Sequence, residues 1–359
     1  MVWQHLREKK MNTRRIVNNE RLLIYLLLLG VACIMIFKDT GSFLSLGVAC
    51  KTVAKLNVTT GIITEPSLTD PEKDDGRSQD PVRYSYRSIQ VHDLFHFIIT
   101  TDTMDWKMTR AVETVFYHHP HATVKIHSNK LLEESYKPKV QAFQSAGYNL
   151  VVVAFDLDAL LRKWATETGN SEIVDKFVQR KDSLIQNDVY WYSNETNLLR
   201  YLLLYHYGGF YFDTDIYVQQ SIPSIVTNVV GLENKKVING AAMAFQKNHE
   251  FMSASVKEFL ITYEKKIGTW GAFGPFLISR LYKNNQDYKA TVTLHPPKTF
   301  QPIPWPEVNQ KCFQEVGYTV DLNRTLAVHT NNKFSSKYNH TKEGTFCDMV
   351  YHKYLSSVL

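Results

Sequence analysis

The sequence predicts an α/β fold built on a parallel, doubly wound sheet. From residue 91 onward, short apolar runs alternate with helical patterns, which is typical of strand and helix units packed on a covered sheet. The chain has 359 residues, of which 44% are hydrophobic and 13% aromatic, enough for a large buried core. No G-x-G-x-x-G motif follows an expected strand, so a dinucleotide site of the NAD type is disfavoured.

The chain begins with a basic segment and an apolar span. Several Lys and Arg residues between positions 7 and 21 precede the uncharged run at 22–37, which Lys38 and Asp39 close. As a helix this run would be about 24 Å long, short for an average bilayer but tolerable in thinner early-secretory membranes. A cleaved signal peptide is the alternative, and residues 43–50 offer small side chains for it. The run itself ends without a small-x-small site, which favours an uncleaved anchor.

The charge distribution predicts the topology of this anchor. More positive charge lies before the span than after it, so we expect residues 1–21 in the cytosol and everything beyond the membrane segment 22–37 in the lumen, as in a type II membrane protein. Much of the formal net charge of +6 lies in this leader. It therefore indicates topology, and nucleic acid is not an expected partner.

A stem and a globular domain follow the span. Residues 51–87 carry Thr, Ser, Asp, Pro and Gly with little apolar periodicity, so we expect a flexible lumenal stem over 38–90. The globular domain then occupies 91–359. Its first elements are expected, in order, as a strand at 94–100, a helix at 105–118, a strand at 122–127, a helix at 137–146 and a strand at 149–155.

Lumenal placement agrees with the sequons and cysteines. Sequons of the form N-x-S/T occur at Asn57, Asn194, Asn323 and Asn339. Cys33 lies in the apolar span and Cys50 just beyond it, which leaves Cys312 and Cys347 in the globular part. In an oxidising compartment a disulfide between these two is a reasonable hypothesis.

The most informative pattern, at 194–218, combines a helix, a glycine stop and a strand. Ser193 or Thr196 can cap the helix, and Gly208 and Gly209 supply the left-handed residues that end it. Residues 210–218 are rich in β-forming side chains and are expected as one strand.

Asp213 and Asp215 form a D-x-D pair in that expected strand. Residues two apart in extended backbone project to the same side, so both carboxylates can face one ligand. Like charges so placed repel each other unless a cation lies between or beside them. Because Mn²⁺ or Mg²⁺ prefers carboxylate and phosphate oxygens, we expect an ion that joins the pair to the diphosphate of a nucleotide sugar.

A second D-x-D pair, Asp156 and Asp158, has a different context. It follows a buried strand and begins a helical pattern, where Asp is favoured as a cap and near the positive helix end. We therefore interpret this pair as structural.

Four blocks of the sequence resemble one family, the α-1,4-galactosyltransferases and α-1,4-N-acetylglucosaminyltransferases with a DXD sugar-binding region. The blocks lie, in order, at 198–215, 237–252, 270–280 and 302–333. The resemblance spans residues 95–354, weakly before residue 190 and strongly after it.

The resemblance implies a GT-A fold, a Rossmann-like nucleotide-sugar-binding domain over 91–359. It implies transfer of a hexose, galactose from UDP-galactose, onto a glycolipid or glycan acceptor in α-1,4 linkage, with retention of configuration and with Mn²⁺ or Mg²⁺ as cofactor. It also implies a Golgi membrane enzyme of glycosphingolipid biosynthesis; a homodimer is left open.

By position, the resemblance also implies site residues. Donor contacts are expected from Asp213, Asp215, Arg200, Asn197 and Asn239. Metal ligands are expected from Asp213, Asp215 and His329, and an acceptor site at Trp270, Gly274 and Pro275. A lone His in a strand is more often structural, and core packing is the alternative for Trp270.

One departure from the family pattern concerns the donor. Relatives usually carry an acidic residue where this chain has Asn197, which can still hydrogen-bond to sugar hydroxyls but lacks the charge. UDP-N-acetylglucosamine or GDP-mannose as donor, with glycoprotein or polysaccharide glycans as acceptors, and a catalytically silent sugar-binding protein therefore stay open. No spacing identifies a carboxylate nucleophile, so the catalytic residue is unknown and a front-face mechanism is the default.

Overall fold

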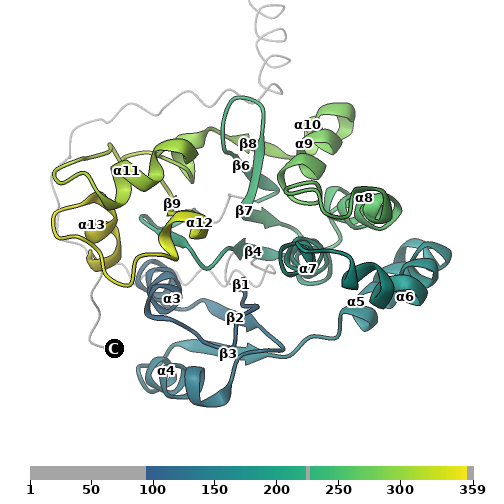
Figure 1. Cartoon of the computed structure of the whole chain (residues 1–359), viewed down its shortest axis with the longest axis horizontal. Coiled ribbons are helices and arrows are strands. Elements are labelled where there is room, and N and C mark those ends of the chain that lie inside the picture. Colours follow the sequence, from purple (N-terminus) through teal and green to yellow (C-terminus); the bar gives the residue numbers. More distant parts are fainter. Residues whose placement is uncertain (1–93, 224–226, 354–359) are drawn as a thin grey trace, which may run out of the picture. The chain divides into compact units, whose positions relative to one another are not determined.

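The computed structural model describes residues 94–223 and 227–353, which belong to the compact unit Tyr84–Leu359 (Figure 1). The expected cytosolic tail, apolar span and stem, with Asn57, lie outside the described residues. Within the described ranges, no helix is both long and apolar enough to cross a membrane.

A seven-stranded sheet in the order β3-β2-β1-β4-β7-β6-β8 organises the domain (Figure 1). Its first half is parallel: β1 (Leu94–Ile98), β2 (Thr123–His127), β3 (Asn149–Val153) and β4 (Gly209–Phe212). The alternation of strands and helices predicted this half correctly, because each crossover between parallel strands needs a helix-length connection.

The second half of the sheet is mixed, so the expectation of a wholly parallel sheet is wrong there. β7 (Ile238–Phe245) runs antiparallel to both β4 and β6 (Val229–Leu232), and β8 (Thr293–His295) pairs parallel with β6. The connection between β6 and β7 is too short for a crossover, and only antiparallel strands can be joined by such a hairpin.

The helices of the parallel half follow the expected pattern. α3 (Trp106–His118) begins after Asp105, whose side chain accepts a hydrogen bond from the Met108 N–H. α4 (Glu133–Ser145) begins before the expected residue 137, with two acidic residues in its first turn. That arrangement suits the positive end of a helix.

α5 (Leu157–Thr168), α6 (Ser171–Gln186) and α7 (Trp191–Tyr207) connect β3 to β4. The expected caps of α7, Ser193 and Thr196, both lie inside the helix, whose N-cap is Tyr190. The entry is fixed instead by Asp188, which accepts hydrogen bonds from the Tyr190 N–H at 3.0 Å and the Asn194 amide at 2.7 Å.

The glycine stop of α7 is present as predicted. Gly208 and Gly209 have φ values of 67° and 95°. A Cβ on Gly209 would lie 2.4 Å from the Leu94 carbonyl oxygen, so glycine lets β4 approach β1.

The chain after β4 does not continue as the expected single strand. β4 ends at Phe212, a turn covers residues 213–215, and β5 (Ile216–Val218) pairs antiparallel with β9 (Ala327–His329) in a separate two-stranded sheet. The Asp213 N–H donates to the Ala241 carbonyl at 2.8 Å and the Ile216 N–H to the Asp213 carbonyl at 3.1 Å, which closes the turn. Asp is poorly suited to a strand interior, and the β-forming residues on both sides concealed this break.

Two apolar clusters cover the two faces of the sheet. Phe210 and Phe212 point into one cluster and Tyr211 into the other, as the period of two in a strand requires. The second cluster includes residues of α5 to α7, α8 (Glu250–Lys266), α9 (Pro275–Asn284) and α10 (Gln286–Thr291). Figure 1 shows these helices gathered on one side and α3 on the other.

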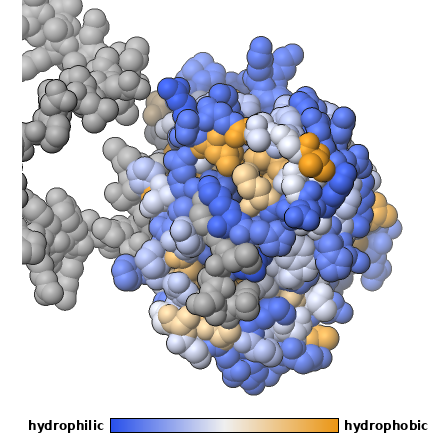
Figure 2. Space-filling view, turned by 90° about the vertical axis from the view of Figure 1, so that its left-hand side faces the viewer, coloured by the Kyte–Doolittle hydropathy of each residue, from blue (hydrophilic) through white to orange (hydrophobic). Residues whose placement is uncertain are grey.

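The C-terminal segment packs against α3. It comprises η2 (Pro297–Thr299), η3 (Trp305–Glu307), α11 (Val308–Phe313), β9, α12 (Asn332–Ser335) and α13 (Phe346–His352). A disulfide joins Cys312 of α11 to Cys347 of α13, with a Cα–Cα distance of 4.8 Å. On the face shown in Figure 2, the surface is largely hydrophilic, and hydrophobic residues gather in a hollow in its upper part.

Candidate active site

Three ionisable side chains converge where the main sheet ends. Asp213 follows β4, Asp215 precedes β5, and His329 ends β9 opposite Ile216. One ligand atom from each of the three side chains lies within 4.8 Å of the others. The pairing of β5 with β9 therefore brings together residues that are far apart in the sequence.

Asp215 is buried, with 3% of its surface exposed, and one of its oxygens is unsatisfied. Oδ2 accepts a hydrogen bond from the Asn332 N–H at 2.5 Å and lies 3.3 Å from His329 Nε2. Oδ1 is buried without a hydrogen-bond partner among the residues that the structure describes. A buried carboxylate oxygen without a partner is costly, so this atom suits a cation.

The electrostatics keep Asp215 ionised. Burial alone would raise its pKa, but the nearby His329 and the Asn332 N–H outweigh burial and lower the pKa of Asp215. For His329, burial would lower the pKa, and the carboxylates of Asp215 and Asp213 raise it above its usual value.

The imidazole of His329 is oriented by Gln301. His329 Nδ1 lies 2.9 Å from Gln301 Oε1, and Gln301 Nε2 donates to the Ile303 carbonyl at 2.9 Å. Because Gln301 Oε1 can only accept, the network places a proton on Nδ1 and directs Nε2 toward Asp215. A metal-binding His is commonly fixed by such a hydrogen bond.

Asn239 joins the same network. Its Nδ2 lies 3.3 Å from His329 Nδ1 and 3.5 Å from Gln301 Oε1, while its Oδ1 accepts from the Ala241 N–H at 2.8 Å. Gln301 is a residue that sequence reasoning missed, because no pattern distinguishes this amide from a solvated one.

Asp213 is half-buried, and two neighbouring side chains fix its carboxylate. The Tyr211 hydroxyl donates to its Oδ1 at 2.5 Å, and Arg200 Nη2 lies 3.3 Å from the same oxygen. Arg200 stacks 4.6 Å from the centre of the Tyr211 ring and donates to the Gly240 carbonyl at 2.6 Å. Arg200 therefore positions Asp213 as well as lining the cavity.

A cavity of about 600 Å³ opens beside these groups. Of the expected site residues, the lining includes Asn197, Arg200, Asp213, Asp215, Asn239, Trp270, Pro275 and His329. Gly274 is not part of the lining but packs against Asn197, whose Oδ1 would lie 2.7 Å from a Cβ at Gly274. The structure thus brings the separately chosen residues together around one cavity.

Aromatic side chains also line this cavity. Trp270 is 54% exposed and touches Tyr190 edge to face at 5.4 Å, so the alternative of core packing is wrong. Phe276 and Trp305, which sequence reasoning did not select, line the same cavity, and Lys333 lies 5.1 Å from the centre of the Trp305 ring.

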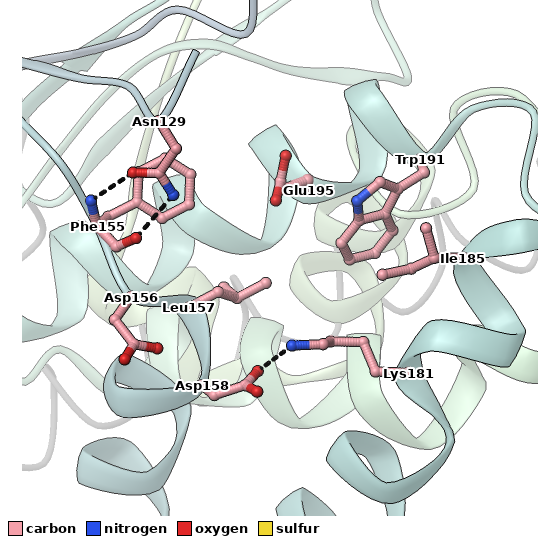
Figure 3. Close-up of a pocket in the computed structure, with 9 residues that line it drawn as sticks. All are labelled: Asn129, Phe155, Asp156, Leu157, Asp158, Lys181, Ile185, Trp191 and Glu195. Carbon is pink, nitrogen blue, oxygen red and sulfur yellow. Dashed lines mark hydrogen bonds and ion pairs between the residues drawn. The ribbon is translucent and has the colours of Figure 1, made fainter.

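The second D-x-D pair lies beside a different cavity, of about 490 Å³, shown in Figure 3. Asp156 Oδ1 accepts from the Ala159 N–H at 2.9 Å and caps α5, which confirms the expected capping role. Asp158 pairs with Lys181 at 2.5 Å. Both carboxylates therefore already have partners within the fold.

The sequons differ in accessibility. Asn194 lies inside α7 with 2% exposure and donates to Asp188, so the expected glycosylation at Asn194 does not fit the folded chain. Asn323 and Asn339 are exposed.

Two consecutive regions of the chain match known glycosyltransferase families. Residues 97–236 match a glycosyltransferase sugar-binding region containing a DXD motif, and residues 244–355 match an alpha 1,4-glycosyltransferase conserved region. Lactosylceramide 4-alpha-galactosyltransferase of Pongo pygmaeus is 37% identical over 147 residues, 38% of this chain and 66% of that protein. The same-named protein of Rattus norvegicus is 37% identical, over 38% of this chain and 40% of that protein. The chain thus matches less than two thirds of the length of these curated relatives.

Solved structures also show some likeness. The galactosyltransferase LgtC, in complex with donor and acceptor sugar analogs, has a TM-score of 0.40 and 12% identity, over 66% of this chain and 86% of that one. The apo glycosyltransferase GlyE of Streptococcus pneumoniae TIGR4 has a TM-score of 0.43 and 12% identity, over 73% of this chain and 60% of that one.

Proposed function

We propose that this chain transfers galactose from UDP-galactose onto a glycolipid in α-1,4 linkage. The premise is its family: the chain belongs to the glycosyltransferases that combine a DXD sugar-binding region with an alpha 1,4-glycosyltransferase conserved region. The observation that carries this proposal is the convergence of Asp213, Asp215 and His329 beside one large cavity. The names of the curated relatives support galactose and a lactosylceramide-type acceptor.

The three converging side chains fit a divalent cation. Two carboxylates and one imidazole suit Mn²⁺ or Mg²⁺, and the unpartnered Oδ1 of Asp215 leaves a ligand atom unused within the described residues. When bound, such an ion would neutralise charge on the diphosphate leaving group.

Other residues of the cavity would bind the donor and the acceptor. Asn197, Arg200 and Asn239 would contact the donor, and Trp270, with the loop at Gly274 and Pro275, would hold the acceptor. In the transfer, the bond from the sugar C1 to the diphosphate oxygen breaks and a bond from an acceptor hydroxyl oxygen to C1 forms. The leaving diphosphate takes the electron pair, and the hydroxyl proton passes to it. Retention by this front-face route, on a GT-A-type domain, is part of the proposal.

The cellular setting is also a proposal. The basic leader and the apolar run at 22–37 support a type II anchor in the Golgi membrane, with residues 91–359 in the lumen as the catalytic domain. The substrates would then meet at the lumenal membrane surface.

Donor hydrolysis tests the proposal most simply. The purified full chain is incubated with UDP-galactose, UDP-N-acetylglucosamine or GDP-mannose, each with and without Mn²⁺. The proposal expects Mn²⁺-dependent release of UDP from UDP-galactose above that from the other donors. Preference for another donor would reassign the substrate. No turnover with any donor would instead support the silent sugar-binding protein that Asn197 leaves open.

A further inference from the structure

The turn between β6 and β7 places a carboxylate at the cavity. Glu233 follows β6, and its N–H donates to the Val237 carbonyl at 2.9 Å, which closes the hairpin. Asn234 Oδ1 accepts from the N–H groups of Lys236 and Val237 at 2.9 and 3.1 Å, so the turn has a defined shape. Glu233 lines the cavity of Asp213, Asp215 and His329.

Glu233 lines this cavity together with its exposed neighbour on the turn, Asn234. Glu233 itself is half-buried, whereas residues 234–236 beside it are exposed. Among the described residues, none forms a hydrogen bond or an ion pair with the side chain of Glu233. Burial raises the pKa of Glu233, with His329 acting against it. A partly desolvated carboxylate without a partner gains nothing for folding, so it is suited to a ligand.

The charge of the cavity indicates which ligand. Asp213, Asp215 and His329 converge in this cavity, where the diphosphate would bind with its cation. An ionised Glu233 would repel the phosphates, so it fits a neutral ligand rich in hydroxyl groups. A carboxylate offers two acceptor oxygens and can receive two neighbouring O–H groups of a sugar.

The position of Glu233 distinguishes the acceptor from the donor sugar. The donor sugar is joined to the diphosphate and would lie near Arg200 and Asn197, which are 7% and 5% exposed. The acceptor must enter from solvent, and the half-buried Glu233 lines the same cavity as the solvent-exposed rings of Trp270 and Phe276. An aromatic face together with a few directed polar groups is what a sugar ligand requires.

We propose that Glu233 selects the acceptor: its carboxylate accepts hydrogen bonds from hydroxyl groups of the sugar that receives the transferred hexose. This inference rests on the proposed function and adds a specificity-determining residue to it. The substitution Glu233→Gln keeps the size of the side chain but replaces one acceptor oxygen with a donor.

The test compares transfer with hydrolysis. The full chain and its Glu233→Gln, Glu233→Asp and Lys235→Gln variants are given UDP-galactose and Mn²⁺, with octyl β-lactoside as acceptor. For Glu233→Gln we expect the acceptor KM to rise and the ratio of transfer to hydrolysis to fall, each by about tenfold or more. Glu233→Asp should recover part of this loss. Lys235 is exposed on the same turn and outside the cavity, so Lys235→Gln should match the wild type.

The outcomes separate the two proposals. If the wild type transfers galactose and Glu233→Gln keeps its acceptor KM and its ratio, the role of Glu233 is overturned and the proposed function stands. If transfer and hydrolysis fall by the same factor, Glu233 acts on the donor or the cation, which also overturns the inference. A wild type that neither hydrolyses nor transfers refutes the proposed function, and the inference falls with it.

Discussion

A substitution of Gln301 can test the metal-site hypothesis without replacing any of the proposed metal ligands. Gln301 holds a proton of His329 on Nδ1 and so keeps Nε2 directed at Asp215. Gln301→Leu removes this hydrogen bond, and we expect Mn²⁺ affinity to fall about 10- to 100-fold. Titration calorimetry of the full chain measures it.

The exposed Gln310 of α11 provides the matched control for that substitution. Gln310→Leu should bind Mn²⁺ like the wild type. Equal Mn²⁺ affinity in the Gln301 variant would mean that His329 is held by β9 alone or does not bind the ion.

Two buried histidines on neighbouring strands predict a pH-dependent stability. His96 Nδ1 lies 3.0 Å from His127 Nε2, and His96 Nε2 lies 3.0 Å from the Gly208 carbonyl. Burial lowers the pKa of His96 to about 4 and that of His127 to about 3. The folded pair therefore stays neutral at pH values where unfolded histidine, with a pKa of about 6.5, takes up protons.

The free energy of unfolding should therefore fall as the pH drops below about 6.5, by up to roughly 1.4 kcal/mol per pH unit for each histidine. Urea unfolding at several pH values measures this slope. His127→Gln should flatten the slope, and the exposed His121→Gln should not. The same slope in all three proteins would contradict the assignment.

At the scale of the elements, the sequence predicted β1 to β3, the helices between them and the turn from α7 into β4, but it did not predict α6 and missed the break after β4. β1, α3, β2 and β3 lie within a few residues of their expected positions because their periodicity reflects local burial. Residues 210–218 showed continuous β propensity, yet tertiary hydrogen bonds to Ala241, Thr330 and Asn332 divide them into two sheets. Such partners cannot be read from local sequence.

The site was predicted in the same uneven way. Asp213 and Asp215 were found by spacing, but they approach each other in a turn and not along one face of a strand. His329 and Asn239 came only from the family resemblance. Gln301, Glu233 and the exposed Phe276 and Trp305 required the fold, since nothing in their local sequence marks them.

The disulfide between α11 and α13 is an element-scale feature that closes a loop with a sequence separation of 35. On the chain-entropy view, Cys312→Ser with Cys347→Ser should lower the free energy of unfolding by about 3–4 kcal/mol. Thermal and urea unfolding check this. Non-reducing peptide mapping of the wild type should recover the two cysteines as one cross-linked peptide, and two free thiols would contradict the pairing.

At the scale of the whole molecule, glycosylation reports both topology and fold. If the domain is lumenal, we expect glycans at the exposed Asn323 and Asn339 and none at the buried Asn194. Glycopeptide mass spectrometry of the protein from a secretory host measures occupancy. A glycan at Asn194 would contradict the packing of α7 against Asp188. The absence of glycans at both Asn323 and Asn339 would contradict the lumenal placement.

The central claim is that Asp215, and not the second D-x-D pair, serves the chemistry. The matched measurement is turnover of UDP-galactose with Mn²⁺ by Asp215→Asn and by Asp158→Asn, each first shown to be folded by circular dichroism. We expect Asp215→Asn to lower turnover by roughly a hundredfold or more, because an amide lacks the charge that holds the cation. Asp158→Asn loses the ion pair with Lys181 and should keep its turnover, with stability lowered by about 1 kcal/mol. A folded Asp215→Asn variant with normal turnover, beside an inactive Asp158→Asn variant, would contradict this claim and place the active site at Asp156 and Asp158.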